Sequence, residues 1–523
     1  MRPTFLGFQI AGRALAASQA NLEVTGNNIA NVNTEGYSRQ RVDLNSISAS
    51  GFNQKYSVPG ASVGLGVEAS GISQIRDPFL DLRYRSENAE SGKLDTLLSG
   101  LSDLENIFDE TENPGLQAEL SNFLNQLQEL SKSPQSKDLS LIVRTAAQKL
   151  TQIINIYSQQ TDQVRDQQIY GLKNIVVDND FNALVKNISS LNQQIREDQT
   201  YGDPSNELMD RRNTLVDQLS RIANIKVTMT PEKISENQTI ERMSISLYDP
   251  SSGTSIGLVN NDLYNTLSVD DSKESLSIQI NSSFNPNVPG GTSDITNYFK
   301  GGVIKGYLDV INGKGTYSDT SVGENTFRGA LHYRGAMNTF AAKIADVFNN
   351  INAVADPSAP PDGIIPKPLF EASDGGISIT AGNIRISAAW LDDPSYITTT
   401  KDGDASSGGS DNILKMIQAM SAKHDFKNNS GSTVFEGTYN QYMSGLIGEL
   451  ALDKNLHENF AGTSGNVLTN LSKARESISG VSMDEEGINL MAFQKSYNAA
   501  ARFLTVLDEA VDTLINRMGI VGR

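Results

Sequence analysis

The chain has 523 residues, enough for several domains, and 38% of them are hydrophobic. Its formal net charge of −18 argues against nucleic acid or an anionic membrane surface as a partner. Zero cysteines exclude disulfides, thiol catalysis and cysteine-based metal sites. No stretch approaches the roughly eighteen apolar residues of a membrane span, and Arg13 interrupts the N-terminal apolar stretch, so we expect neither membrane insertion nor a cleavable secretory signal.

The N-terminal segment predicts an amphipathic helix with a seam of three-four spacing. Large residues occupy one seam position and small residues the other, a pattern that lets two helix axes approach closely. The seam consists of Phe8, Ala11, Leu15, Ser18, Leu22, Thr25, Ile29 and Val32. After it, Gly36 marks a turn, and the segments Tyr37 to Leu44 and Val58 to Ile75 are expected to form short strands.

Helical periodicity then dominates from Pro78 to Ile222. Leucine-rich stripes predict two helices between Leu94 and Leu130 and a long third from Leu141 to Ile175. Two more are expected around Phe181 to Arg196 and Glu207 to Ile222. Their lengths and apolar stripes indicate a bundle of long antiparallel helices.

Two segments with period-two alternation interrupt the helical pattern. The first, from Ile225 to about residue 310, predicts a small β domain that Gly301 to Asp309 closes. Helical character returns from Asn325 to Ala355, before a shorter β insertion at 356–409. Helices are then expected at Asn412 to Ala422 and Thr433 to Ile478.

The C-terminal segment, Gly480 to Arg523, carries a seven-residue repeat typical of a coiled coil. Ser482 and Glu485 form a capping box at its start. A helix of this kind cannot bury its seam alone, so it needs a partner, and the N-terminal helix is the candidate. The expected seam residues are Leu15, Leu22 and Ile29 at one end and Leu490, Phe493, Tyr497, Leu504, Leu507, Val511 and Leu514 at the other.

These patterns predict a mainly α fold with inserted β and nested domains. The terminal coiled-coil helices lie in 1–60 and 480–523, and the long helical bundle takes 61–224, 311–355 and 410–479. The small β domain is expected at 225–310 and the short β insertion at 356–409. In the dilute monomer we expect the terminal helices to be mobile. The alternative is that the two helices pair within one chain and are already ordered.

The sequence offers no convincing catalytic motif. A G-x-S-x-G string at Gly60, Ser62 and Gly64 lies in a glycine-rich turn without the helix that a nucleophile elbow requires. His457 and Glu458 are followed by Ala461 where a zinc-binding H-E-x-x-H motif needs histidine. We therefore expect neither an enzyme nor a metal or cofactor site.

Several strings resemble a known family. SQANLEVTGNNIANVNTEGYSRQ, from Ser18 to Gln40, is similar to the N-terminal signature of the bacterial flagellar axial proteins, which include rod, hook and hook-associated proteins. A narrower likeness points to the hook-associated proteins of the hook-filament junction. It rests on GYSRQRV (Gly36 to Val42), NELMDRRNTLVDQLSRIANIKV (Asn206 to Val227), SDNILKMIQ (Ser410 to Gln418) and the segment from Ser479 to Gly519.

The resemblance implies a structural subunit that polymerises through its terminal helices to connect hook to filament. Implied partners are the hook protein, a second junction protein, further copies of the chain in a helical ring, and an export chaperone on the C-terminal helix. The implied location is extracellular, after export through the flagellar type III apparatus. Alternatives at this point are another hook or rod-like axial protein, or a secreted surface-binding protein or adhesin.

Overall fold

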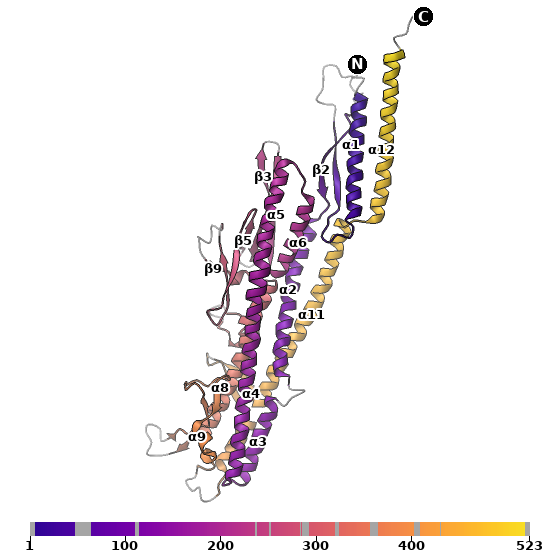
Figure 1. Ribbon diagram of the computed structural model, residues 1–523. Helices are drawn as coiled ribbons and strands as arrows, with labels where there is room; N and C mark the ends of the chain where they lie inside the picture. The colour runs from indigo at the N-terminus through magenta and orange to yellow at the C-terminus, as the bar shows by residue number, and fades with distance from the viewer. Residues whose placement is uncertain are drawn as a thin grey trace, which may run out of the picture.

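The computed structural model describes residues 6–47, 64–109, 115–235, 238–249, 253–282, 284, 292–319, 324–355, 364–401, 408–428 and 430–517. The molecule is elongated, and its first and last long helices lie side by side at one end (Figure 1). The segments 48–63, 356–363 and 402–407, including Gly60 and Ser62, lie outside the described residues, as do parts of the strands and the β insertion expected there.

The terminal unit consists of two helices and one hairpin. Helix α1 (Leu6–Ala30) is followed by β1 (Gln40–Ser46) and β2 (Val67–Gln74), which pair antiparallel with Gln40 opposite Gln74. Helix α12 (Met483–Asp512) continues into a π-helical turn, η7 (Thr513–Arg517). Ser482 caps α12 by accepting a hydrogen bond from the backbone of Glu485, which confirms the predicted start of this helix.

The body begins with a helical bundle. Helices α2 (Pro78–Phe108), α3 (Leu116–Lys132), α4 (Lys137–Tyr170), α5 (Asn182–Tyr201) and α6 (Asn206–Ile222) follow in order. A π-helical segment, η1 (Gly171–Phe181), joins α4 to α5, so the two helices expected as separate elements form one continuous helical run. Asp77 caps α2 and Pro78 occupies its first turn, as the sequence rules for helix starts require.

The inserted β region contains two antiparallel sheets. The first has the order β3 (Ile225–Ser235), β4 (Gln238–Tyr248), β5 (Ser255–Asn260) and β6 (Leu263–Tyr264). The second joins β7 (Thr266–Asp270), β8 (Ser277–Asn281) and β9 (Thr292–Asp294), followed by the 3₁₀ turn η2 (Thr296–Tyr298). The expectation that Gly301 to Asp309 closes the β domain is wrong, because α7 (Val303–Asn312) is a helix that packs on α2.

The chain then returns to the bundle. After the 3₁₀ turn η3 (Gly315–Tyr317) come α8 (Ala330–Asn352), the paired strands β10 (Val354–Ala355) and β11 (Ile364–Ile365), and the paired strands β12 (Phe370–Ala372) and β13 (Ile384–Ile386). A short helix α9 (Ala388–Asp392), the turn η5 (Pro394–Tyr396) and α10 (Asp411–Ser421) follow. The hairpin β14 (His424–Lys427) and β15 (Thr433–Gly437) leads into α11 (Tyr439–Ser479).

The expected helical start at Thr433 is therefore wrong, since Thr433–Gly437 is a strand. Helix α11 starts only after Thr438, whose side chain accepts from the backbone of Gln441 while the Gln441 side chain accepts from the backbone of Thr438. This capping box fixes the boundary. The mainly α fold with small inserted sheets is confirmed.

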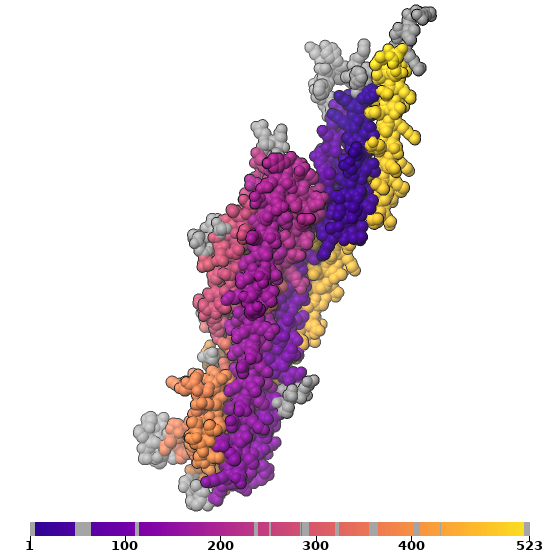
Figure 2. All heavy atoms as spheres, viewed as in Figure 1, coloured from indigo at the N-terminus to yellow at the C-terminus, as the bar shows by residue number. Residues whose placement is uncertain are grey.

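Two apolar clusters hold the body together. The first joins α3, α4, α8 and α10 with the β12–β13 insertion, whose Trp390 is fully buried. The second joins η1, α5, α6 and α7 with both larger sheets. Neither cluster contains a residue of the terminal unit. The body thus has its own cores, and the terminal unit projects beyond them (Figures 1 and 2).

Candidate functional site

The terminal helix pair is the site that the sequence predicts, and α1 and α12 do pack against each other along their length. They run antiparallel: near the start of α1 a Cβ added to Gly7 would approach the Leu507 methyl group to 2.9 Å, and near its end Asn28 bonds to Glu486. Ala11, Ser18 and Thr25 continue the helical stripe of Gly7, and all three are buried. Small side chains on α1 therefore permit the close contact with α12.

The ten predicted seam residues divide into two groups. Those that are partly buried are Leu15, Leu22, Ile29, Phe493, Leu504, Leu507 and Val511. By contrast, Leu490 is 39% exposed, Tyr497 38% and Leu514 46%. The heptad pattern predicts that both seam positions of α12 face one partner. In the structure, the side chains of Glu486, Phe493 and Leu507 at one seam position are more buried than those of Leu490 and Tyr497 at the other.

Helix α12 has a second apolar face that the heptad pattern does not predict. Ile488 is 63% exposed, Met491 57%, Phe503 46% and Val506 59%. These residues recur in the sequence at three-residue steps, 488 to 491 and 503 to 506, but they do not follow the seven-residue repeat of the predicted seam. A helix that is apolar on more than one side requires further neighbours, because its own chain covers one side alone.

One buried carboxylate lies at the base of the pair. Glu486 is 2% exposed and accepts from Arg39 Nε at 2.8 Å and Asn28 Nδ2 at 3.3 Å. Arg39 also reaches Glu485 at 2.7 Å. Asn28 in turn accepts from Tyr37 and from the backbone of Gln40. Glu486 thus links α1, the start of β1 and α12, which explains a charge at a position that the heptad reserves for apolar residues.

Tyr37 completes this cluster, and its chemistry reflects the surroundings. Burial, together with the nearby carboxylates Asp210, Glu207 and Glu486, raises the pKa of its hydroxyl to about 12. The phenol therefore remains a hydrogen-bond donor to Asn28 Oδ1, at 2.9 Å, throughout the neutral range.

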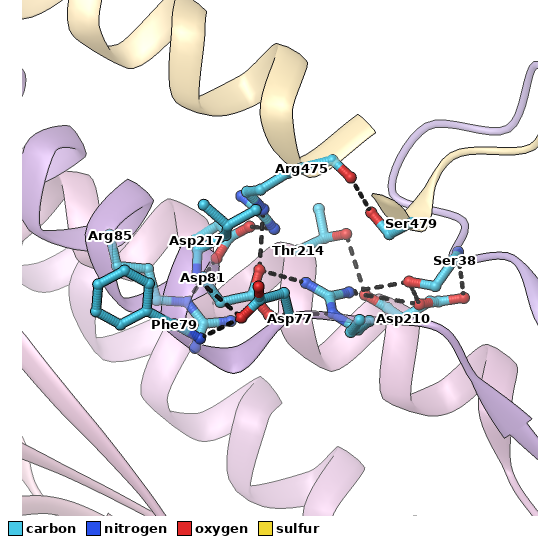
Figure 3. A network of polar contacts seen from close by, with 12 residues as sticks. Ser38, Asp77, Phe79, Asp81, Arg85, Asp210, Thr214, Asp217, Arg475 and Ser479 are labelled. Carbon is cyan, nitrogen blue, oxygen red and sulfur yellow. Dashed lines mark hydrogen bonds and ion pairs between the residues drawn. The ribbon is translucent and has the colours of Figure 1, made fainter. Parts of the chain in front are cut away.

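Below the pair, a chain of ion pairs connects the terminal unit to the body (Figure 3). Asp210 on α6 accepts from the Ser38 hydroxyl at 2.6 Å and from the Ser38 backbone at 3.0 Å. Arg76 donates to Ser38 Oγ at 3.0 Å and pairs with Asp81 at 3.1 Å. Arg475 on α11 pairs with Asp81 on α2 at 2.9 Å. This series of ion pairs then continues to α6.

The far end of this chain is Asp217, which receives Arg475 at 2.8 Å and Arg85 at 2.7 Å. Burial alone would raise the pKa of Asp81, but the hydrogen bond and charge of Arg76, with the charge of Arg475, hold that pKa below its usual value. Burial raises the pKa of Asp210 despite its Ser38 hydrogen bonds. The contacts of Asp217 and Asp210 leave no signal in the sequence, because their partners Arg475, Arg85 and Ser38 lie more than a hundred residues away along the chain.

Within the described residues, no group of three histidine, aspartate or glutamate side chains is placed to hold a metal ion. His332 is buried beside Arg328, and burial lowers its pKa to about 4. In the described part of the chain, no helix combines the length and apolarity needed to cross a bilayer.

Comparison with family models gives three matches. Residues 8–37 match the flagella basal body rod protein family, and residues 475–518 match the C-terminal domain of the flagellar basal body rod FlgEFG proteins. Residues 101–355 match the helical domain of flagellar hook-associated protein FlgK. The first two matches coincide with α1 and α12, so the terminal pair defines the chain as a flagellar axial protein.

Whole-chain relatives narrow this class. The chain is 29% identical over 532 residues to flagellar hook-associated protein 1 of Bacillus subtilis, with full coverage of both chains. It is 24% identical to the protein of that name from Escherichia coli, covering 96% of this chain and 98% of the relative. Along its whole length the chain is therefore similar to flagellar hook-associated protein 1, and the alternative of another rod or hook protein is not favoured.

A solved structure agrees at the level of fold. The flagellar hook junction protein FlgK from Burkholderia pseudomallei superposes with a TM-score of 0.56 at 13% sequence identity. The match covers 76% of this chain and all of that one. It therefore supports the arrangement of helical bundle and small β domains.

Proposed function

We propose that the chain is a structural subunit of the bacterial flagellum at the hook-filament junction, where it polymerises through its terminal helices. The observation that carries this proposal is the incomplete burial of α12. Phe503 and Val506 are 46% and 59% exposed although the α1-facing side of the same helix is covered. Neighbouring subunits in a helical assembly would bury that outer face. Its exposure to water in the isolated chain costs free energy, because the face is apolar.

The partners follow from the same geometry. We propose the hook protein on one side, a second junction protein on the other, and further copies of this chain around the ring. Before assembly, α12 suits the groove of a helical export chaperone, with the exposed Leu490 and Tyr497 and the partly buried Leu504 and Val511 as contacts. Export through the flagellar type III apparatus to the extracellular flagellum, and a mechanical rather than catalytic role, complete the proposal.

Electron microscopy of cells lacking the chain tests this function. We expect hooks without filaments, and filament subunits released into the medium. Normal filaments on the deleted strain would contradict the proposal. A second readout is the length of the exported protein, because loss of its first residues outside the cell would contradict export without a cleaved signal.

Two adjacent substitutions then separate the two faces of α12. Leu504→Asp puts a charge against α1, whereas Phe503→Asp puts one on the outer face. An unpaired charge that becomes buried costs several kcal/mol, so neither variant should restore filaments to the deleted strain. The Gln128→Asp variant, at an exposed position of α3, should restore them. Filaments with Phe503→Asp would show that the outer face is not an assembly surface.

A further inference from the structure

Helix α11 of the body carries an apolar stripe that its own chain leaves exposed. Leu452 is 68% exposed, Leu456 46% and Phe460 51%. Their four-residue spacing places these three residues, the α11 stripe, along one side of the helix. Among the exposed positions of α11 between 451 and 470, Glu458 is the one charged residue. A surface that is apolar and nearly free of charge is typical of the centre of a protein–protein interface.

A second set of exposed apolar side chains lines a groove of the body. The groove lies between α2 and the junction of α4 with η1, is also lined by Tyr307 of α7, and has a volume of about 410 Å³. At its edge, Tyr170 is 63% exposed and Ile175 is 51% exposed. Large side chains with this exposure beside a hollow surface are suited to contact an apolar ridge of another molecule.

Two contacts of α2 give the relative positions of the α11 stripe and this groove. Glu105 pairs with Lys454 of α11. Asp103 accepts from Gln168 Nε2 of α4 at 2.9 Å. Residues two positions apart on a helix point about 200° apart, so α11 and α4 lie on opposite sides of α2. Figure 1 shows α2 between them. Because positions 103 and 105 are at the same height on α2, the two contacts are at the same level of the molecule.

The stripe and the groove therefore face away from each other. Leu452 and Leu456 are each two residues from Lys454, so their side chains point away from α2 by the same helical spacing. One copy can present its stripe to the groove of a copy beside it without a shift along the long axis. A contact between two different surfaces repeats from copy to copy, and so builds rings or helices instead of closed dimers.

The charges of the two surfaces are compatible with such a contact. Copies of a chain with a net charge of −18 repel one another, and a face with few charges lowers that repulsion. Of the two carboxylates that line the groove, Asp95 pairs with Arg221 at 2.8 Å and Asp103 has its bond from Gln168. Asn455, exposed beside the stripe, adds an uncharged amide with two N–H donors. A second copy of this acidic chain is therefore a suitable occupant of the groove.

We infer that the body forms a lateral contact between copies, in which the α11 stripe of one copy occupies the groove of the next. The contacting residues are Leu452, Leu456 and Phe460 on one side and Tyr170 and Ile175 on the other. The inference rests on the proposed junction function and deepens it, because it assigns an assembly surface to the body in addition to the outer face of α12. The two surfaces are continuous, since α11 leads into α12 along one edge of the molecule (Figure 1).

Thiol cross-linking on assembled flagella tests the inference. The chain has no cysteine, so introduced cysteines react without background. Asn459→Cys, next to the stripe, is combined with Gln167→Cys, in the lining of the groove; both positions are exposed, and the apolar contacts are kept. Flagella of the deleted strain carrying this variant are treated with a short bismaleimide. We expect the monomer band to shift into a ladder of dimers and larger oligomers on a denaturing gel.

The matched control combines Asn459→Cys with Gln128→Cys, at an exposed position of α3, and should remain monomeric. If filaments form and the ladder is absent, the inference is wrong although the proposed function stands. A ladder of equal strength in the control would also overturn it, because the contact would not be specific to the groove. Normal filaments on the strain without the chain would contradict the proposed function, and the inference with it.

A second variant tests the stripe without cysteines. Leu456→Asp places a charge in the α11 stripe, where it would be buried against the next copy, so this variant should not restore filaments. Circular dichroism of the monomer should be unchanged, because Leu456 is exposed there. Thr469→Asp, at an exposed position of the same helix, is the control and should restore filaments. Normal filaments with Leu456→Asp would overturn the inference.

Discussion

The body and the terminal unit bury their side chains in different ways. In the body, large aromatic residues such as Phe123, Phe348 and Trp390 are fully enclosed. In α12, which spans thirty residues, the one buried side chain is the carboxylate of Glu486. Two parts of one chain therefore follow different rules: the body reaches its fold through its own cores, whereas the terminal helices leave apolar surface for other molecules.

The largest expected effect comes from opening the core of the body. Phe348→Ala removes a ring that lies 5.4 Å from the Phe123 ring, and cavities of this kind cost about 3–5 kcal/mol of unfolding free energy. Urea denaturation followed by circular dichroism measures the loss. Phe460→Ala, which truncates a 51% exposed ring of α11, is the control and should stay within about 0.5 kcal/mol. Equal losses of unfolding free energy in Phe348→Ala and Phe460→Ala would contradict the distinction between core and surface.

The next largest effect is a loss of stability in acid. It distinguishes the body from the terminal unit, because all three histidines lie in the body. Burial, with the Arg328 charge, lowers the pKa of His332 from 6.5 to about 4. Folding therefore favours neutral His332, whose stabilisation is fully present above pH 6.5 and is lost as pH falls toward 4. This corresponds to about 3 kcal/mol at about 1.4 kcal/mol for each pKa unit.

The test of that effect is a comparison of unfolding free energies at pH 7 and pH 4.5. His332→Gln should lose less stability than the parent chain over this interval, because glutamine does not titrate there. His457→Gln is the control. Burial lowers the pKa of His457 as well, but this residue is only half-buried on α11, so its replacement should change the pH dependence less than His332→Gln does. An identical pH dependence in His332→Gln and the parent chain would contradict the assignment.

A smaller effect is expected at the base of the helix pair. Glu486→Gln removes the charge that accepts from Arg39, and a hydrogen bond to a charged group contributes about 1.5–3 kcal/mol. Amide hydrogen exchange in α12 should become faster while exchange in α3 and α4 is unchanged. Glu485→Gln, whose side chain is 62% exposed, should have almost no effect. Equally faster exchange throughout the body in Glu486→Gln would contradict this local role.

The smallest effect on the monomer comes from the outer face of α12. Val506→Ser should change the unfolding free energy by less than about 0.5 kcal/mol, because Val506 is already 59% exposed. Its effect should instead be seen in assembly, as a higher protein concentration needed for polymerisation in vitro. Lys495→Ala, on the same helix, is the control. Loss of monomer stability with normal assembly would reverse the roles that we assign to the two regions.

Much of the body could be predicted from the sequence because its signals are local. Apolar stripes and caps such as Ser482 determine helix positions, and alternation from Ile225 predicts the sheets. The segment Gly301 to Asp309 was expected to close the β domain, whereas Ile304, Leu308 and Ile311 form the buried face of helix α7. Thr433–Gly437 was missed as a strand because the capping residue Thr438 was not used.

The candidate site was predicted only in part. The heptads identified α12 and its α1-facing residues, such as Phe493 and Leu507, since seam periodicity is a property of one helix. The Asp210–Ser38 contact could not be found in this way, because it depends on how α6 meets a loop 172 residues earlier in the chain. Tertiary polar contacts of this kind leave no period in the sequence.

The most direct test of the central claim, that the body is stable alone while the terminal helices depend on neighbours, is hydrogen exchange on the monomer and on the assembled protein. We predict that amides of 491–514 exchange much faster than those of α3 and α4 in the monomer, and become protected on assembly. Slow exchange of 491–514 in the monomer, matching the core helices, would instead show that the α1–α12 pair is stable by itself and would contradict the account.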